Sequence, residues 1–176
     1  MTEADLADIV VVDIETGGLD PETNPILEIG AATLNSPGSL FSMMVRPPEW
    51  MEIDRQAINV NGYTPEEWSR ASSLEHVLRT LSAWLEQGGY ENRAILAGMN
   101  PGFDLGFLRR AYRVQHLDFP FSHRTVDLHS WAVAFALQRE KRIRRLHTDA
   151  VYRLLSLPPE PKPHRALQGA RLERKA

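Results

Sequence analysis

The sequence predicts an α/β fold, with a mixed sheet of an antiparallel meander plus parallel strands and with helices on its faces. Three apolar, β-branched runs joined by short connections come first, which is typical of an antiparallel meander. Helical and strand-like patterns then alternate toward the C-terminus, which favours a mixed sheet flanked by helices. The chain has 176 residues and no linker or repeat, so we expect one domain over 1–176.

The first third of the chain contains the expected meander. Residues 8–14 are rich in valine and isoleucine and predict a buried strand, and 26–34 predict a second one after a turn-rich loop. A third strand is expected from Leu40 until the proline pair that begins at Pro47. Residues 51–63 are expected to be irregular.

Helical signals follow. Thr64 before Pro65 predicts the start of a short helix, and 72–89 carries a leucine stripe that two glycines terminate. The remaining expected elements are a strand over 93–98, a helix over 102–114, a strand ending near Val126, helices over 128–140 and 146–155, and a last helix over 164–175.

The composition narrows the possible chemistry. Apolar residues make up 43% of the chain and charged residues 24%, as in ordinary globular proteins. The absence of cysteine excludes disulfides and thiolate metal sites, so a metal ion would bind through oxygen or imidazole ligands. No apolar run could cross a membrane and the acidic N-terminus does not resemble a signal peptide, so we expect a cytoplasmic protein without a membrane partner.

The net charge of −3 argues mildly against a nucleic-acid-binding protein, but the charges are unevenly distributed. The acidic surplus lies largely in the first half. This division suits an acidic metal site flanked by phosphate-facing basic segments, whereas a solvated helix face is the plainer interpretation of either basic cluster alone. The two clusters comprise Arg109, Arg110 and Arg113, and Arg139, Lys141, Arg142, Arg144 and Arg145.

Two carboxylates lie at the end of the first predicted strand. Asp13 and Glu15 are two residues apart, so a strand sends both side chains to one face. Adjacent carboxylates repel each other unless a cation lies between them, and oxygen ligands suit Mg²⁺ or Mn²⁺. Taken alone, the pattern is better explained by two acids exposed at a strand terminus.

Two later residues add to this pattern. Asp104 lies in the first turn of a predicted helix, where an acid also complements the helix dipole. His164 follows a proline-rich loop and stands where the last helix begins, a position from which it could act as a general base or as a simple loop residue.

Taken together, three segments resemble the DEDD superfamily of 3′→5′ exonucleases in its histidine-bearing (DEDDh) branch, which includes polymerase proofreading subunits and ribonuclease T. The segments are DIETGGLD at 13–20, NPGFDLGFL at 100–108 and HRALQGA at 164–170. Because three motifs occur in order over nearly the whole chain, the resemblance is far more specific than any one of them. It implies an RNase-H-like fold.

The resemblance also implies roles for individual residues. Asp13, Glu15 and Asp104 would hold two ions of Mg²⁺ or Mn²⁺, and His164 would activate water. The implied substrate is single-stranded DNA or RNA with a free 3′ end, shortened by one mononucleotide at a time, and a DNA polymerase is a conceivable partner. The residues implied to contact the terminal nucleotide are Thr16, Leu19, Asn100 and Phe103.

One position departs from the family pattern. An aspartate is expected five residues after the histidine, but Gly169 stands there. Three interpretations remain: an active nuclease with a weakened metal site, an active nuclease in which Glu173 one helical turn later substitutes, or a nucleic-acid-binding module or polymerase accessory subunit without catalysis. Asp149 is a further substitute without positional support. On this pattern, Gly169→Asp is predicted to tighten metal binding.

Overall fold

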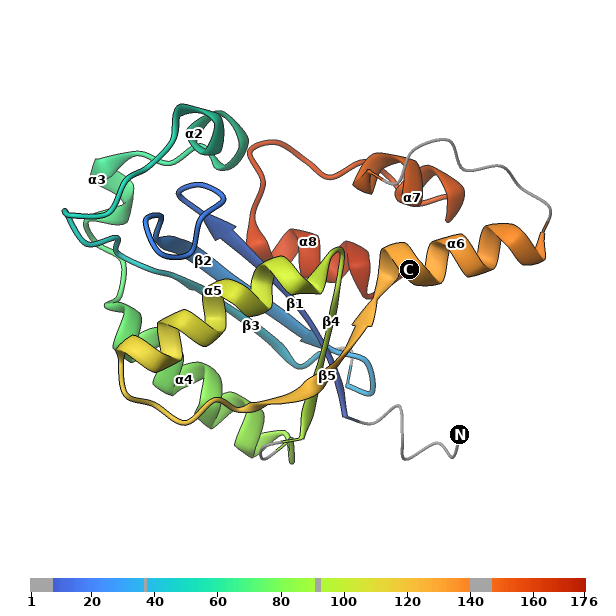
Figure 1. Ribbon diagram of the computed structural model, residues 1–176, viewed down its shortest axis with the longest axis horizontal. Coiled ribbons are helices and arrows are strands. Elements are labelled where there is room, and N and C mark those ends of the chain that lie inside the picture. Colours follow the sequence, from blue (N-terminus) through green and yellow to red (C-terminus); the bar gives the residue numbers. More distant parts are fainter. Residues whose placement is uncertain (1–7, 37, 91–92, 140–146) are drawn as a thin grey trace.

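The computed structural model describes residues 8–36, 38–90, 93–139 and 147–176. Its centre is a five-stranded sheet in the order β3-β2-β1-β4-β5 (Figure 1). β1 pairs antiparallel with β2 and β2 with β3, while β1 pairs parallel with β4 and β4 with β5. The expected mixed sheet is therefore confirmed. The strands are β1 (Ile9–Thr16), β2 (Ile26–Thr33), β3 (Leu40–Met44), β4 (Ala94–Gly98) and β5 (Phe121–Asp127).

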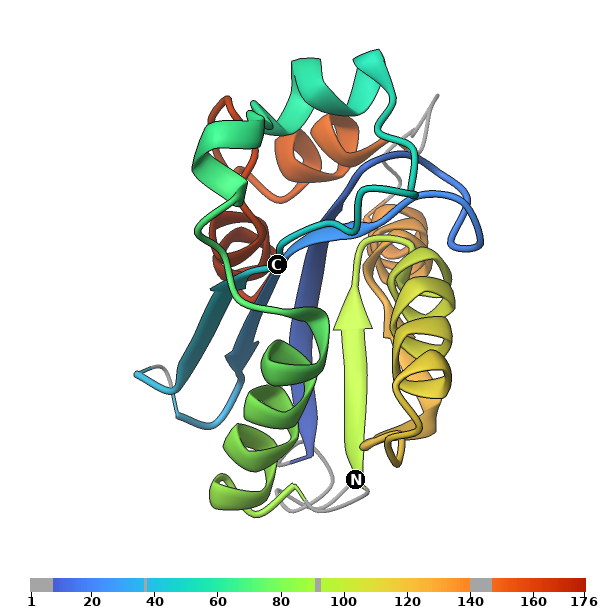
Figure 2. The ribbon, with the colours of Figure 1, turned by 90° about the vertical axis from the view of Figure 1, so that its left-hand side faces the viewer.

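Helices cover both faces of this sheet. α4 and α5 lie on one face and α8 packs on β1 and β2 from the other, while α2, α3 and α7 lie beyond the end at which β1 and β4 finish (Figures 1 and 2). The helices are α2 (Arg55–Asn61), α3 (Pro65–Trp68), α4 (Leu74–Gln87), α5 (Pro101–Val114), α6 (Leu128–Gln138), α7 (Thr148–Leu154) and α8 (Ala166–Glu173).

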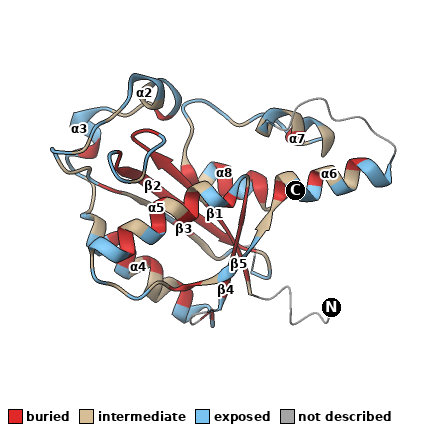
Figure 3. Ribbon diagram, viewed as in Figure 1, coloured by how far each residue is buried: buried red, intermediate tan, exposed pale blue. Residues whose placement is uncertain are grey.

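The alternation along β1 assigns its side chains to two cores. Val10, Val12 and Ile14 join the large core beneath α4 and α5, whereas Ile9 and Val11 join the smaller core that includes a residue of α8. The central strands are buried almost throughout (Figure 3). The same alternation places the side chains of Asp13 and Glu15 on the face of the sheet that α8 covers.

The expectation of irregular structure over 51–63 is wrong, because α2 occupies Arg55–Asn61. This helix has no apolar stripe, and Asn61 is its buried residue. The side-chain amide of Asn61 donates to the Thr16 carbonyl over 3.0 Å, and Gly62 ends the helix with φ of 70°. Tertiary contacts therefore hold a helix that the local pattern does not signal.

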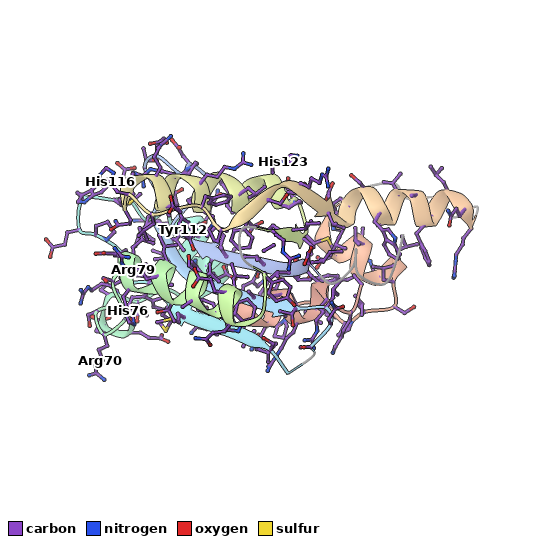
Figure 4. All side chains as sticks on the ribbon, turned by 90° about the horizontal axis from the view of Figure 1, so that it is seen from below. Arg70, His76, Arg79, Tyr112, His116 and His123 are labelled. Atoms are coloured by element: carbon purple, nitrogen blue, oxygen red, sulfur yellow. The ribbon has the colours of Figure 1, made fainter. Side chains whose placement is uncertain are left out.

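α4 and α5 are joined through a tyrosine rather than through apolar contacts alone. Tyr112 points from α5 toward α4, where its hydroxyl donates to the Leu78 carbonyl over 3.1 Å and lies 3.0 Å from Oγ of Ser82 (Figure 4). The buried ring and the satisfied hydroxyl together fix the position of α5, which carries one of the predicted metal ligands.

The first basic cluster is engaged in contacts within the protein. Arg110 and Arg113 both pair with Glu22, at 3.2 and 3.0 Å, so they tie α5 to the loop after β1. Arg109 lies 5.7 Å from the centroid of the Phe119 ring. Most of the second cluster falls within 140–146, outside the described residues. Within the described part of the chain, none of the helices is long and apolar enough to cross a membrane.

Gly30 in β2 brings α8 close to the sheet. A Cβ atom there would collide with the backbone of Ala166 and Leu167. We therefore expect Gly30→Ala to push α8 outward and to lower the free energy of unfolding by about 1–3 kcal/mol, as overpacking usually does. Thermal melts should show this loss, and Gly106→Ala is the matched control because a Cβ at Gly106 meets no atom within 4 Å. An unchanged melting temperature for Gly30→Ala would contradict the close packing.

Candidate active site

The two carboxylates of β1 lie on the face covered by α8, near the carboxyl end of the strand. Glu15 is buried, and Asp13 is of intermediate exposure and lies directly beside Gly169 of α8. β1 is the central strand and runs parallel to β4, so residues that follow β4 reach the same end of the sheet. This topology explains why residues of the first and second motifs lie close together at this end of the sheet.

Two further carboxylates reach this point from helices. Asp104 in the first turn of α5 accepts a hydrogen bond from the Ile14 amide over 3.1 Å, which ties α5 to β1. Glu173 in α8 is buried and accepts a hydrogen bond from the Met99 amide. A Cβ on Gly98 would lie 3.2 Å from Oε2 of Glu173, so the glycine at the end of β4 leaves room for this carboxylate.

The histidine stands on the loop that leads into α8. The amide of His164 donates to the Val60 carbonyl over 2.9 Å, which anchors this loop to α2. Its Nδ1 lies 3.4 Å from Oε2 of Glu160, a residue of the proline-rich loop. The side chain of His164 is 29% exposed, so Glu160 contacts one ring nitrogen while water and substrate can reach the histidine.

Crowding of acids changes their ionisation. Burial, followed by repulsion from Glu160 and Glu28, raises the pKa of Glu15 to about 8. Burial raises the pKa of Asp104 to about 7. Burial and the neighbouring charges of Glu173 and Asp104 raise the pKa of Asp13. Such raised pKa values indicate carboxylates with too little water and too few hydrogen-bond donors around them. A divalent cation would stabilise their charged forms.

The pKa of the histidine moves in the opposite direction. Burial, with the positive charge of Lys162 as the second cause, lowers the pKa of His164. Near neutral pH the imidazole is therefore uncharged and able to accept a proton.

These residues enclose one cavity of about 480 Å³, which Asp13, Glu15, Glu160, His164 and Glu173 all line. A second pocket of about 290 Å³ adjoins it, because Ile14, Glu15 and Val60 line both. The two pockets form one cleft, and its acidic half is the candidate site.

The structure brings together three of the four residues expected at the nucleotide. Thr16, Leu19 and Phe103 line the smaller pocket, and Leu19 is 80% exposed. The Thr16 hydroxyl donates to the Gly18 carbonyl over 2.6 Å and so shapes the loop. Asn100 lines neither pocket: it begins α5 in a left-handed conformation, with φ of 56°.

The position of Gly169 is not an open gap. A Cβ atom there would lie 2.8 Å from Cγ of Asp13, closer still to its Oδ2, and 3.3 Å from Oε1 of Glu160. The Asp13 carboxylate thus occupies the space that a side chain at 169 would need. Gly169→Asp can therefore tighten metal binding only if the Asp13 side chain first turns away, a steric requirement that the sequence does not show.

Glu160 is the site residue that sequence reasoning missed. Ligand atoms of Glu15, Glu160 and His164 lie within 4.8 Å of one another, a grouping that could hold a metal ion. The only available signal was an acid four residues before the histidine in a loop of prolines, and that loop belongs to no motif.

The sequence matches a known protein family over most of its length. The exonuclease (RNase_T) family model matches residues 10–173. A DNA polymerase III of the PolC type from Thermotoga maritima is 32% identical over 170 residues, and a second from Thermotoga petrophila is equally similar. In each case the match covers 94% of this chain but 11% of the relative, so the chain spans about a tenth of the length of these proteins.

Solved structures support the same fold. The nuclease domain of 3'hExo, a DEDDh family member bound to rAMP, superposes with a TM-score of 0.73 at 18% identity, over 95% of this chain and 88% of that one. Exonuclease I of E. coli in complex with a dT13 oligonucleotide gives 0.77 at 14% identity, over 94% of this chain and 39% of that one. At these identities the likeness shows the fold alone.

Proposed function

The chain belongs to the exonuclease (RNase_T) family, and from this premise we propose that it is a metal-dependent 3′→5′ exonuclease acting on single-stranded DNA or RNA. The observation that carries the proposal is that Asp13, Glu15, Glu173 and His164 line the same cavity, with Asp104 hydrogen-bonded to the adjacent Ile14 amide. The substrate would be a strand with a free 3′ end, from which mononucleotides are released by phosphodiester hydrolysis.

The acidic residues fit a pair of divalent cations. Asp13, Glu15 and Asp104 are the proposed ligands, and Glu173 adds a carboxylate beside Asp13 and Asp104. The buried Oε2 of Glu173 has no hydrogen-bond partner among the described residues, and this oxygen and the raised pKa values are what such a site would show before cations bind. Mg²⁺ or Mn²⁺ would supply an activated water and stabilise the leaving oxygen.

The protein's own groups would orient the reaction. His164 would take the proton of the attacking water, since its pKa is lowered and its ring is partly exposed in the cavity. The terminal nucleotide would lie in the adjoining pocket, where Leu19 and Phe103 offer apolar surface to a base. Thr16 shapes the turn beneath it.

The main alternative is a nucleic-acid-binding module or polymerase accessory subunit with weak or absent catalysis. The observation that favours it is Gly169, which provides no ligand. The similarity to PolC-type polymerases makes a DNA polymerase a reasonable partner for either function. Buried carboxylates with raised pKa values destabilise a protein that has no cation to bind, so we favour the enzyme.

Digestion of end-labelled strands tests the proposal. We expect 5′-labelled single-stranded DNA or RNA to shorten into a stepwise ladder, EDTA to abolish the reaction, and Mn²⁺ to restore it at least as well as Mg²⁺, because Mn²⁺ binds such sites more tightly. Circular and 3′-phosphorylated strands are the controls and should resist. Cleavage of circles would indicate an endonuclease, and an inert protein that still binds the strands would support the binding module.

A further inference from the structure

We propose that Glu160, from the proline-rich loop, supplies the carboxylate that the last helix lacks at Gly169, and that it also orients His164. This inference rests on the proposed function and extends it, since the family pattern places the fourth acid on the helix. Glu160 would thus be both a metal ligand and the residue that positions His164.

The first argument is position. The Oε1 atom of Glu160 lies 3.3 Å from where the Cβ of residue 169 would be. An aspartate at 169 would project its carboxylate from that same Cβ into the acidic cavity. Glu160 therefore reaches from the proline-rich loop to the edge of the space that a side chain at 169 would need, next to the Asp13 carboxylate that occupies it.

The second argument is unsatisfied bonding. Oε1 of Glu160 is buried and has no hydrogen-bond partner among the described residues, although its side chain is only 13% exposed. A buried carboxylate oxygen without a donor is unfavourable unless a cation compensates it. Glu173 shows the same feature independently: it is 6% exposed, lines the same cavity, and its Oε2 also lacks a partner within the described chain.

The third argument separates these two acids. Glu160 offers an oxygen within 4.8 Å of ligand atoms of both Glu15 and His164. Glu173 instead accepts from the Met99 amide and lies against Gly98, at the end of β4. Glu160 is thus the acid beside Glu15, and Glu173 is the acid on the β4 side of Asp13.

The two oxygens of Glu160 point to different neighbours, which permits both roles. Oε2 lies 3.4 Å from Nδ1 of His164, while Oε1 faces Gly169. A carboxylate at Nδ1 favours the tautomer that leaves Nε2 free to accept a proton. Glu160 would therefore link the metal site to the proton acceptor.

Titration with Mn²⁺ by calorimetry tests this assignment directly, using the full chain. We expect Glu160→Gln to weaken Mn²⁺ binding by at least about tenfold, because losing a carboxylate that merely orients a ligand already costs 10–100-fold in metal affinity. Glu86→Gln is the matched control: Glu86 is exposed on α4 and lines neither pocket of the candidate site. It should leave Mn²⁺ binding nearly unchanged.

The outcomes are distinguishable. Parent-like Mn²⁺ binding by Glu160→Gln would overturn the assignment, as would an equal loss in Glu86→Gln, which would indicate a general charge effect. Circular dichroism in EDTA confirms that each variant is folded. If the parent binds Mn²⁺ but digests no strand, the proposed function fails, whereas an active parent with a parent-like Glu160→Gln variant refutes the role of Glu160 alone.

Discussion

His164→Ala is expected to lower kcat by about 10²–10⁴-fold, the usual effect of removing a positioned proton acceptor. KM for a single-stranded oligonucleotide should change little, because His164 contributes to the cavity and not to the pocket proposed for the terminal nucleotide. The measurement is steady-state digestion at saturating Mn²⁺. Because the pKa of His164 is lowered, activity of the parent should fall only when the pH drops below the ordinary histidine range.

His76→Ala is the matched control for this prediction. His76 is exposed in the first turn of α4, on the helix that covers the other face of the sheet (Figure 4). It should behave like the parent protein. If His164→Ala also kept the parent rate, His164 would be an ordinary loop residue, and the proton would have to leave to solvent.

The sequence predicts the fold well where the local pattern and the tertiary packing agree. Alternation in residues 9–15 placed Asp13 and Glu15 on one side of a strand, and the two cores confirm which neighbours lie on each side. α2 was missed because its stability comes from distant contacts of Asn61, which no local periodicity records. A capping residue signalled α3 correctly, since Thr64 accepts from the Glu67 amide, and the leucine stripe signalled α4.

The candidate site was only partly predictable for a similar reason. Three motifs named residues that the topology does bring to one end of β1, because β4 runs parallel to β1 and α5 begins just after β4 ends. The position of Glu160 depends on how a loop without periodicity folds back over α8, which composition alone does not specify. Gly169 reads as a missing ligand in the sequence, whereas in the structure its lack of a side chain makes room for Asp13.

Asp104→Asn is expected to affect activity and stability in opposite directions. The asparagine oxygen can still accept from the Ile14 amide, so the link between α5 and β1 survives while the charge is lost. Without that charge we expect at least about tenfold weaker activity at limiting metal. In EDTA at pH 8, however, the variant should melt at a higher temperature than the parent.

The sign of the stability effect follows from the pKa shifts. In the folded protein the pKa of Asp104 is raised by burial from an ordinary 3.8 to about 7, and that of Glu15 to about 8. A raised pKa means that the folded state holds its protons more tightly than the unfolded state. The stabilising contribution of these groups to the free energy of unfolding is therefore fully present below about pH 4 and is lost as the pH rises through 7–8.

Thermal melts of the parent and of Asp104→Asn at pH 5.5 and pH 8, with EDTA or with Mn²⁺, would measure this contribution. One pKa unit corresponds to about 1.4 kcal/mol, so the variant should gain on the order of a few kcal/mol at pH 8 in EDTA and about half as much at pH 5.5, which lies midway between the ordinary and the raised pKa. Mn²⁺ should stabilise the parent more than the variant, because binding favours the folded state. Asp118→Asn, at an exposed position, is the control for loss of a carboxylate. A variant that melts below the parent at pH 8 in EDTA would show that Asp104 stabilises the metal-free fold, contrary to the electrostatic crowding argued for this site.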